Sequence, residues 1–161
     1  MMYIVIAHME EAGEQVKGFM KSKGRLPKYV NCLCYDNLYD RNVVVKKITM
    51  PQFLYLATAH LGVNSFDGEI RNVNPPSSPL DHWVSGQILE SDYRLMAENI
   101  RNYIEANGKA PNYANSSLGK IPYEMLIYIY ARIYAFMGSY HMTPSHINIG
   151  FLEEDDTIEQ V

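Results

Sequence analysis

The sequence predicts a mainly α-helical domain, made of two helix–turn–helix repeats packed as a pseudo-twofold helical domain with room for short β segments. Residues 24–30 (GRLPKYV) recur as residues 108–114 (GKAPNYA), and an asparagine follows each copy. Each copy lies between two segments of helical character. Internal repetition indicates repeated structural units, and one helical hairpin cannot bury the apolar stripes of both its helices. We therefore expect the two units to pack together.

Composition sets the broad class. The chain has 161 residues, of which 47 % are hydrophobic and 20 % charged, which is ordinary for a globular domain. The formal net charge is −4, and residues 153–159 (EEDDTIE) predict a solvated acidic tail. A mildly negative chain does not suit phosphate neutralisation, so no nucleic-acid partner is expected. The first residues lack a basic region and a long apolar run, so no signal peptide is expected.

The first unit begins with a predicted helix over residues 9–23. Its apolar residues fall at helical spacing, and its acidic residues precede its basic ones, which complements the helix dipole. Gly24 stands where a left-handed C-cap is needed, and Pro27 prevents the helix from continuing. The glycine and proline of the repeated turn are therefore explained by geometry alone.

An irregular segment and a second helix complete this unit. Residues 31–49 are rich in turn formers, although three consecutive valines favour a short strand. Thr49 or Met50 can cap the following helix, and Pro51 suits its first position. Gly62 ends it.

The second unit follows a linker. Residues 63–80 are rich in Asn, Ser and Pro, which indicates a boundary between halves. Trp83 comes next, either as a binding platform or as a plug between the units. The next helix has Ser91 or Asp92 as its predicted N-cap, and Gly108 closes it.

The last helix is predicted over residues 122–137. It is apolar almost all round, with interleaved tyrosines, but Glu124 and Arg132 interrupt it. A membrane span needs about 20 apolar residues, so a buried central helix is favoured and no membrane span is expected. The tyrosines suit the core or an interface, with a carbohydrate- or peptide-binding face as the alternative.

Alignment of the two copies predicts the domain organisation. The turns lie 84 positions apart, whereas Pro51 and Pro122 lie only 71 apart, so the first unit carries about 13 extra residues in its irregular segment. The predicted organisation is a first repeat unit, a linker, a second repeat unit and an acidic tail, at residues 1–62, 63–80, 81–150 and 151–161.

The two cysteines, Cys32 and Cys34, are one residue apart. This spacing strains a disulfide, and a lone C-x-C lacks the second ligand pair of a structural zinc site. Two free thiols on a short extended segment are therefore expected. His141 and His146 have no acidic residue close in sequence and do not indicate a metal site. No metal and no cofactor are predicted.

The residues around both turns resemble the pseudomurein-binding repeat. The first unit carries the pattern in residues 16–30 (VKGFMKSKGRLPKYV) and 50–57 (MPQFLYLA), and the second in 103–113 (YIEANGKAPNY) and 121–123 (IPY). The second unit departs from the pattern at Ala110, at Ala114 and in its shorter loop. Together the units cover about two-thirds of the chain, and the duplicated turn makes the resemblance specific.

This resemblance implies a module that targets pseudomurein, the peptide-cross-linked cell-wall glycan of certain methanogenic archaea. Such repeats occur on archaeal cell-surface proteins and at the N-terminus of pseudomurein endoisopeptidases, including those of archaeal viruses. Those enzymes carry a separate C-terminal cysteine peptidase domain with a Cys-His-Asp triad. No such set is evident here, so the resemblance implies a non-catalytic, wall-associated binder attached to an endolysin or a surface protein.

Aromatic and amide side chains near the turns are the predicted ligand-binding residues, since rings stack on sugars while amides bond peptides. They are Tyr29, Asn31, Trp83, Asn112, Tyr113, Asn115 and Tyr123. An enzyme with Cys32 or Cys34 as nucleophile is a second hypothesis, although neither cysteine has a sequence context that lowers its pKa. A helical protein–protein adaptor is a third.

Overall fold

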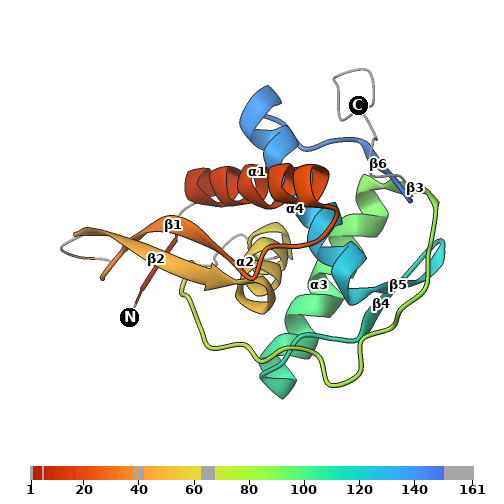
Figure 1. Ribbon diagram of the computed structural model, residues 1–161, viewed down its shortest axis with the longest axis horizontal. Helices are drawn as coiled ribbons and strands as arrows, with labels where there is room; N and C mark the ends of the chain where they lie inside the picture. Colours follow the sequence, from red (N-terminus) through yellow and green to blue (C-terminus); the bar gives the residue numbers. More distant parts are fainter. Residues whose placement is uncertain (1, 5, 38, 40–41, 63–67, 151–161) are drawn as a thin grey trace.

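The fold is mixed α/β. The computed structural model describes residues 2–4, 6–37, 39, 42–62 and 68–150, and these residues form four helices and six strands in three two-stranded sheets (Figure 1). Of the described residues, 67 lie in the helices and 30 in the strands. The prediction of a mainly α, two-repeat helical domain is therefore wrong. The short strand favoured by the three valines is confirmed, within residues 43–49, and the two cysteines lie on an extended segment as predicted. The other strands lie in segments that the sequence predicted to be turns, loops or linker.

The first half of the chain is a helix, a β-hairpin and a second helix. Its elements are α1 (Ile6–Lys23), β1 (Tyr29–Tyr35), β2 (Val43–Thr49) and α2 (Met50–Gly62). The segment predicted to be irregular forms the antiparallel hairpin, with Tyr29 opposite Thr49. In β1 the buried residues alternate with exposed ones along the strand, which is the period-two pattern of a strand with one buried face.

The second half repeats this order. Its elements are α3 (Glu90–Asn107), β4 (Tyr113–Ser116), β5 (Gly119–Pro122) and α4 (Tyr123–Tyr140). Both ends of α3 lie 84 positions after those of α1. In the shorter hairpin Tyr113 is opposite Pro122, so Pro122 is equivalent to Thr49 and not to Pro51. The second strands are therefore related by 73 positions, which corrects the alignment on the two prolines.

Outer strands close each half. The segment before α3, β3 (Gly86–Leu89), pairs with β6 (His146–Ile149) after α4. In the first half Tyr3 forms the corresponding bridge with Glu69, and the N–H of Ile4 donates to the carbonyl of Gly68 at 2.8 Å. We call residues 2–70 unit 1 and residues 86–149 unit 2.

The helices pack crosswise between the units. α1 packs mainly on α4, and α2 on α3. The hydroxyl of Tyr134 in α4 donates to the carbonyl of Ala57 in α2 at 2.6 Å, and that of Tyr130 donates to the carbonyl of Tyr93 at 2.7 Å. Both tyrosines are fully buried. The interpretation of the last helix as a buried central helix is confirmed, and these tyrosine hydroxyls are satisfied inside the core.

The helix ends confirm part of the predicted chemistry. Gly24 and Gly108 adopt φ angles of 72° and 69°, the left-handed conformation of a C-cap. Thr49 and Gln52 form a reciprocal capping box at the start of α2. The predicted N-cap of α3 is wrong: α3 begins at Glu90, and its cap residue, Leu89, makes no side-chain hydrogen bond. The pairing of β3 with β6 fixes the chain there instead.

The connection between the units lies along unit 2 (Figure 1). The N–H of Asn74 donates to the carbonyl of Gly108 at 3.0 Å, and the N–H of Ala110 donates to that of Asn74 at 2.9 Å. The Asn112 side chain accepts a bond from the N–H of Ser78 at 2.8 Å. The second turn is therefore held from outside by the connecting chain. No helix in the described part of the chain has the length and apolar character needed to cross a membrane.

Candidate functional site

A surface groove lies between the first helix and the first hairpin strand of each unit. We call them groove 1 and groove 2; their volumes are about 400 and 430 Å³. Groove 1 is lined by Gln15, Phe19, Arg25, Pro27, Lys28, Tyr29 and Val30. Groove 2 is lined by Asn99, Ile100, Tyr103, Pro111, Asn112, Tyr113, Ala114 and Asn115. Most of these residues are related by the 84-position repeat, so the duplication has produced two equivalent concave surfaces.

The helical wall of each groove presents an amide and an aromatic ring. Gln15 and Phe19 lie one helical turn apart on α1. Asn99 and Tyr103 occupy the equivalent positions on α3. Residues four apart on a helix share a face, so both side chains point to the hairpin. The opposite wall is the Pro-x-Tyr part of the repeated turn.

A lysine covers the turn tyrosine in both grooves. The Lys47 ammonium lies 4.5 Å from the ring centroid of Tyr29, and the Lys120 ammonium 4.6 Å from that of Tyr113. Each is a cation–π contact, which contributes about 0.5–1 kcal/mol at an exposed site. The contact follows from strand register, because each lysine is two residues before the residue paired with its tyrosine. It holds the ring at the edge of the groove.

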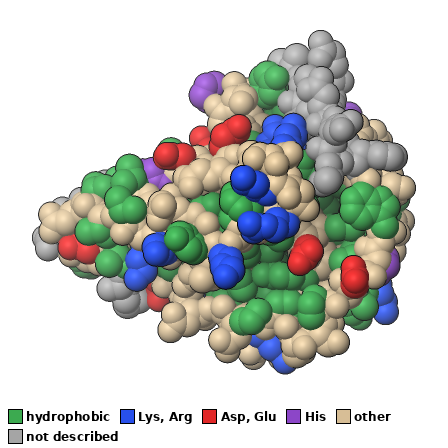
Figure 2. Space-filling view, viewed as in Figure 1, with side chains coloured by type: hydrophobic (Ala, Val, Ile, Leu, Met, Phe, Trp, Pro, Cys, Tyr) green, Lys and Arg blue, Asp and Glu red, His purple; other side chains and the backbone are tan. Residues whose placement is uncertain are grey.

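The grooves differ in charge. Groove 1 is also lined by Arg25 and Lys28, and the Arg25 guanidinium lies 5.1 Å from the centre of the Phe19 ring. Groove 2 has Lys109 and Asn112 at the corresponding positions, and of these only the asparagine lines the groove. In Figure 2, hydrophobic side chains lie between lysine and arginine side chains on the face shown. Groove 1 is thus the more cationic, and groove 2 is richer in amides.

Several predicted ligand-binding residues meet at the grooves. Tyr29 is 43 % exposed in groove 1, while Asn112, Tyr113 and Asn115 line groove 2. Asn31 is exposed on β1, where its backbone carbonyl accepts a bond from Gln15 Nε2 at 2.9 Å. The side-chain oxygen of Asn112 has a structural role as well, because it holds the connecting chain.

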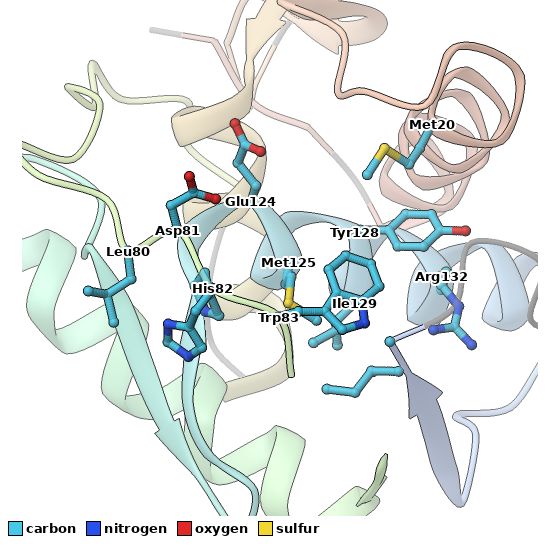
Figure 3. Close-up of a pocket in the computed structure, with 13 residues that line it drawn as sticks. Met20, Leu80, Asp81, His82, Trp83, Glu124, Met125, Tyr128, Ile129 and Arg132 are labelled. Atoms are coloured by element: carbon cyan, nitrogen blue, oxygen red, sulfur yellow. The ribbon is translucent and has the colours of Figure 1, made fainter. Parts of the chain in front are cut away.

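Trp83 and Tyr123 lie elsewhere. Tyr123 is buried at the start of α4, and burial raises the pKa of its hydroxyl. Trp83 is 63 % exposed, which is inconsistent with a plug between the units. It lines a separate apolar pocket of about 120 Å³ beside α4 (Figure 3).

Sequence reasoning missed half of each groove. The missed residues are the helical pairs Gln15 and Phe19, and Asn99 and Tyr103, with the lysines Lys47 and Lys120. Extending the 84-position offset into the helices finds the first four. The equivalence of Lys47 and Lys120 was not found, because the alignment on the two prolines pairs Lys47 with Leu118.

The cysteines are not arranged for catalysis. Cys32 and Cys34 are free thiols on the inward face of β1, as the sequence predicted. Burial, with smaller contributions from Cys34 and Glu11, raises the pKa of Cys32 to about 12. Burial likewise raises the pKa of Cys34 to about 11. Both stay protonated near neutral pH, whereas the thiolate is the nucleophile. Among the described residues, no three His, Cys, Asp or Glu side chains are grouped so that they could hold a metal ion.

Comparisons with known proteins locate the resemblance in unit 2. No curated protein and no solved structure matches the chain. The family match begins in the loop between β4 and β5, includes α4 and ends in β6; it covers less than half of the chain and neither of the repeated turns. Residues 117–149 match the family model described as the pseudomurein-binding repeat, which confirms for this segment the resemblance seen in the sequence.

Proposed function

We propose that this chain binds pseudomurein without cleaving it, through groove 1 and groove 2. The observation that carries the proposal is the match of residues 117–149 to the pseudomurein-binding repeat. Unit 1 lies outside the match, but it has the same order of elements and an equivalent groove. Both units are therefore assigned the same role.

The chemistry of the grooves supports a polymer with both sugar and peptide parts. Each groove combines aromatic rings with amide groups, and a lysine ammonium lies over the tyrosine at its edge. Rings of this kind stack on apolar faces, and the polar groups fix orientation. Tyr29, Tyr113 and Asn115 are the proposed contacts, and Asn31 and Asn112 lie beside them.

Two grooves suit a repetitive wall. Once one groove is occupied, binding at the second becomes intramolecular, with an effective concentration that can reach the millimolar range. Weak contacts of single units then add up to firm attachment. The proposed biological role is to anchor an attached lytic enzyme or surface protein to the archaeal cell wall.

Two alternatives stand beside this proposal. In the first, the chain is the N-terminal part of a pseudomurein endoisopeptidase of a methanogen virus, with the cysteine peptidase domain outside this chain. In the second, it is a helical protein–protein adaptor; the burial of Tyr130 and Tyr134 in the core counts against this, because the tyrosine-rich helix is not free to meet a partner.

Catalysis by the chain itself is disfavoured by the buried, protonated thiols of Cys32 and Cys34. The Cys32→Ser, Cys34→Ser double variant separates binding from catalysis. We expect it to retain wall binding. Loss of a wall-lysing activity of this chain in that variant would instead establish an enzyme.

Co-sedimentation with purified pseudomurein sacculi tests the proposal directly. The chain is mixed with sacculi, the sacculi are pelleted and washed, and the bound fraction is measured. Bacterial murein sacculi are the control polymer, and an unrelated acidic protein of similar size is the control protein. We expect retention on pseudomurein above both controls. Equal recovery in all three experiments would refute the proposal.

A further inference from the structure

The pocket beside Trp83 is a further concave surface, separate from groove 1 and groove 2. It lies where Met20 of α1, the start of α4 and the connecting chain meet. The connecting chain contributes Asp81 and Trp83, and α4 contributes Glu124 and Met125. Unit 1, unit 2 and their connection all line it, and the corresponding pocket on the other side of the molecule has a different lining.

We infer that this pocket binds an uncharged sugar ring of the wall polymer. The inference deepens the proposed function, on which it rests, by adding a sugar site outside both grooves. Trp83 is the single tryptophan of the chain, and 63 % of its surface is exposed. An indole face exposed in an apolar pocket is a stacking surface for the C–H face of a sugar ring.

The polar groups are placed for sugar hydroxyls. In Figure 3 the Asp81 and Glu124 side chains lie at one end of the pocket, and the Trp83 ring lies between them and Arg132. Asp81 and Glu124 are both exposed, so a ligand in the pocket can reach their carboxylates. A carboxylate only accepts hydrogen bonds, and sugar hydroxyls are donors that can reach it without bringing charge.

The corresponding place on the other side of the molecule supports this assignment. There Tyr55 and Ile104 take the positions that Tyr128 and Met20 have beside Trp83. The Tyr55 hydroxyl donates to Glu105 at 2.9 Å, and the Arg71 guanidinium lies 5.6 Å from the centre of its ring. The protein's own side chains therefore satisfy the carboxylate there. Beside Trp83 the carboxylates of Asp81 and Glu124 are exposed, and a ligand can bind them in place of water.

Charge favours a neutral ligand over a lysine side chain. The lining carries two carboxylates, but the buried Arg132 guanidinium is also part of it and lies 5.6 Å from the centre of the Tyr128 ring. His82 contacts the carbonyl of Lys120 through Nε2 at 2.9 Å. An ammonium group would meet both signs of charge, whereas a sugar ring needs only acceptors, donors and a flat apolar surface.

Because Trp83 is the single tryptophan of the chain, its fluorescence reports binding in this pocket. Tryptophan emission of the whole chain is recorded while N,N′,N″-triacetylchitotriose, a neutral N-acetylated sugar, is added. The matched arm uses the peptide acetyl-Ala-Lys-Ala-amide. We expect a saturable change in emission with the sugar and none with the peptide. A response to the peptide alone would make this a cation site, and a response to neither would overturn the inference.

Variants sharpen the assignment. Glu124→Gln and Asp81→Asn keep side-chain size but weaken the acceptors, and each is expected to weaken sugar binding by about tenfold, the loss of one hydrogen bond to a charged group. Glu98→Gln, an exposed change on α3, is the control. Unchanged sugar binding in both carboxylate variants contradicts the inference.

Failure of the inference and failure of the proposed function are distinguishable. Retention on pseudomurein sacculi without a Trp83 response refutes the sugar pocket alone. A Trp83 response without retention on sacculi refutes pseudomurein binding and leaves a sugar-binding pocket.

Discussion

Unit 1 and unit 2 share their order of elements but differ in their hairpins and in the charge of their grooves. Both strands of the first hairpin have seven residues and both strands of the second have four. Figure 1 shows the longer hairpin extending away from the helices, while β4 and β5 remain close to them. The groove lies at the base of each hairpin, where the registers agree. The base is therefore the part that forms the site, and the rest of the hairpin can vary in length.

The shared residues divide into two kinds. Gly24 and Gly108 end helices, and a side chain there would have to adopt a positive φ. Tyr29 and Tyr113, by contrast, are partly exposed under a lysine at the mouth of a groove. The glycine is explained by the fold alone. The tyrosine–lysine pair is the shared feature that points to a ligand.

The largest expected change in the free energy of unfolding comes from a substitution at the helix contact between the units. A Cβ atom on Gly13 would lie 2.8 Å from the carbonyl oxygen of Ala131 and from the Cβ of Tyr134. Gly13→Ala must therefore move α1 away from α4, and we expect it to lower the free energy of unfolding by about 1–3 kcal/mol. The equivalent position in α3 is Ala97. The contact of α1 with α4 therefore requires a glycine where the contact of α3 with α2 accepts an alanine.

Gly18 in the same helix is the control, because nothing lies within 4 Å of a Cβ placed there. Gly18→Ala is expected to raise the free energy of unfolding by about 0.5–1 kcal/mol through helix propensity. Urea unfolding of both variants measures the contrast. Equal stabilisation by the two substitutions would show that α1 and α4 are not in close contact at Gly13.

A smaller difference in the free energy of unfolding is expected between substitutions at the two repeated turns. Asn112 in unit 2 holds the N–H of Ser78, whereas Lys28, its equivalent in unit 1, is exposed. Asn112→Ala should lower the free energy of unfolding by about 0.5–1.5 kcal/mol, the usual contribution of one hydrogen bond. Lys28→Ala should change it by less than about 0.5 kcal/mol. The same loss in both variants would mean that the connecting chain is not anchored at Asn112.

The thiols of unit 1 have no counterpart in unit 2, and they make stability depend on pH only above about pH 9. Because the pKa of Cys32 is raised from 9.0 to about 12 and that of Cys34 to about 11, folding favours the protonated forms. Their contribution to stability is fully present below pH 9 and is lost as the pH rises from about 9 towards 12. The Cys32→Ala, Cys34→Ala variant should lose less stability between pH 9 and 10 than the unaltered chain. Parallel pH profiles would contradict these shifts.

Local signals in the sequence predicted the four helices and the two repeated turns. The ends at Gly24 and Gly108, the cap at Thr49 and the free thiols follow from short-range chemistry. The second hairpin does not, because its strands have only four residues each and include glycine and proline. The outer strands pair residues about 60 positions apart, and no local pattern encodes such a contact.

The site residues likewise divide into those set by local sequence and those set by long-range pairing. Tyr29 and Tyr113 stand inside the repeated turn and are visible in the sequence, whereas Lys47 and Lys120 reach them only through strand register. The burial of Tyr123 also depends on packing, because it is one tyrosine among several in an apolar helix.

Retention on pseudomurein sacculi of Tyr29→Ala, Tyr113→Ala and the double variant tests most directly whether the two grooves are equivalent parts of one binding site. Tyr39→Ala is the control, since Tyr39 is 95 % exposed and lines neither groove. We expect each single variant to bind about tenfold more weakly and the double variant at least a hundredfold more weakly. A correctly folded double variant that is retained as firmly as the unaltered chain would contradict the account.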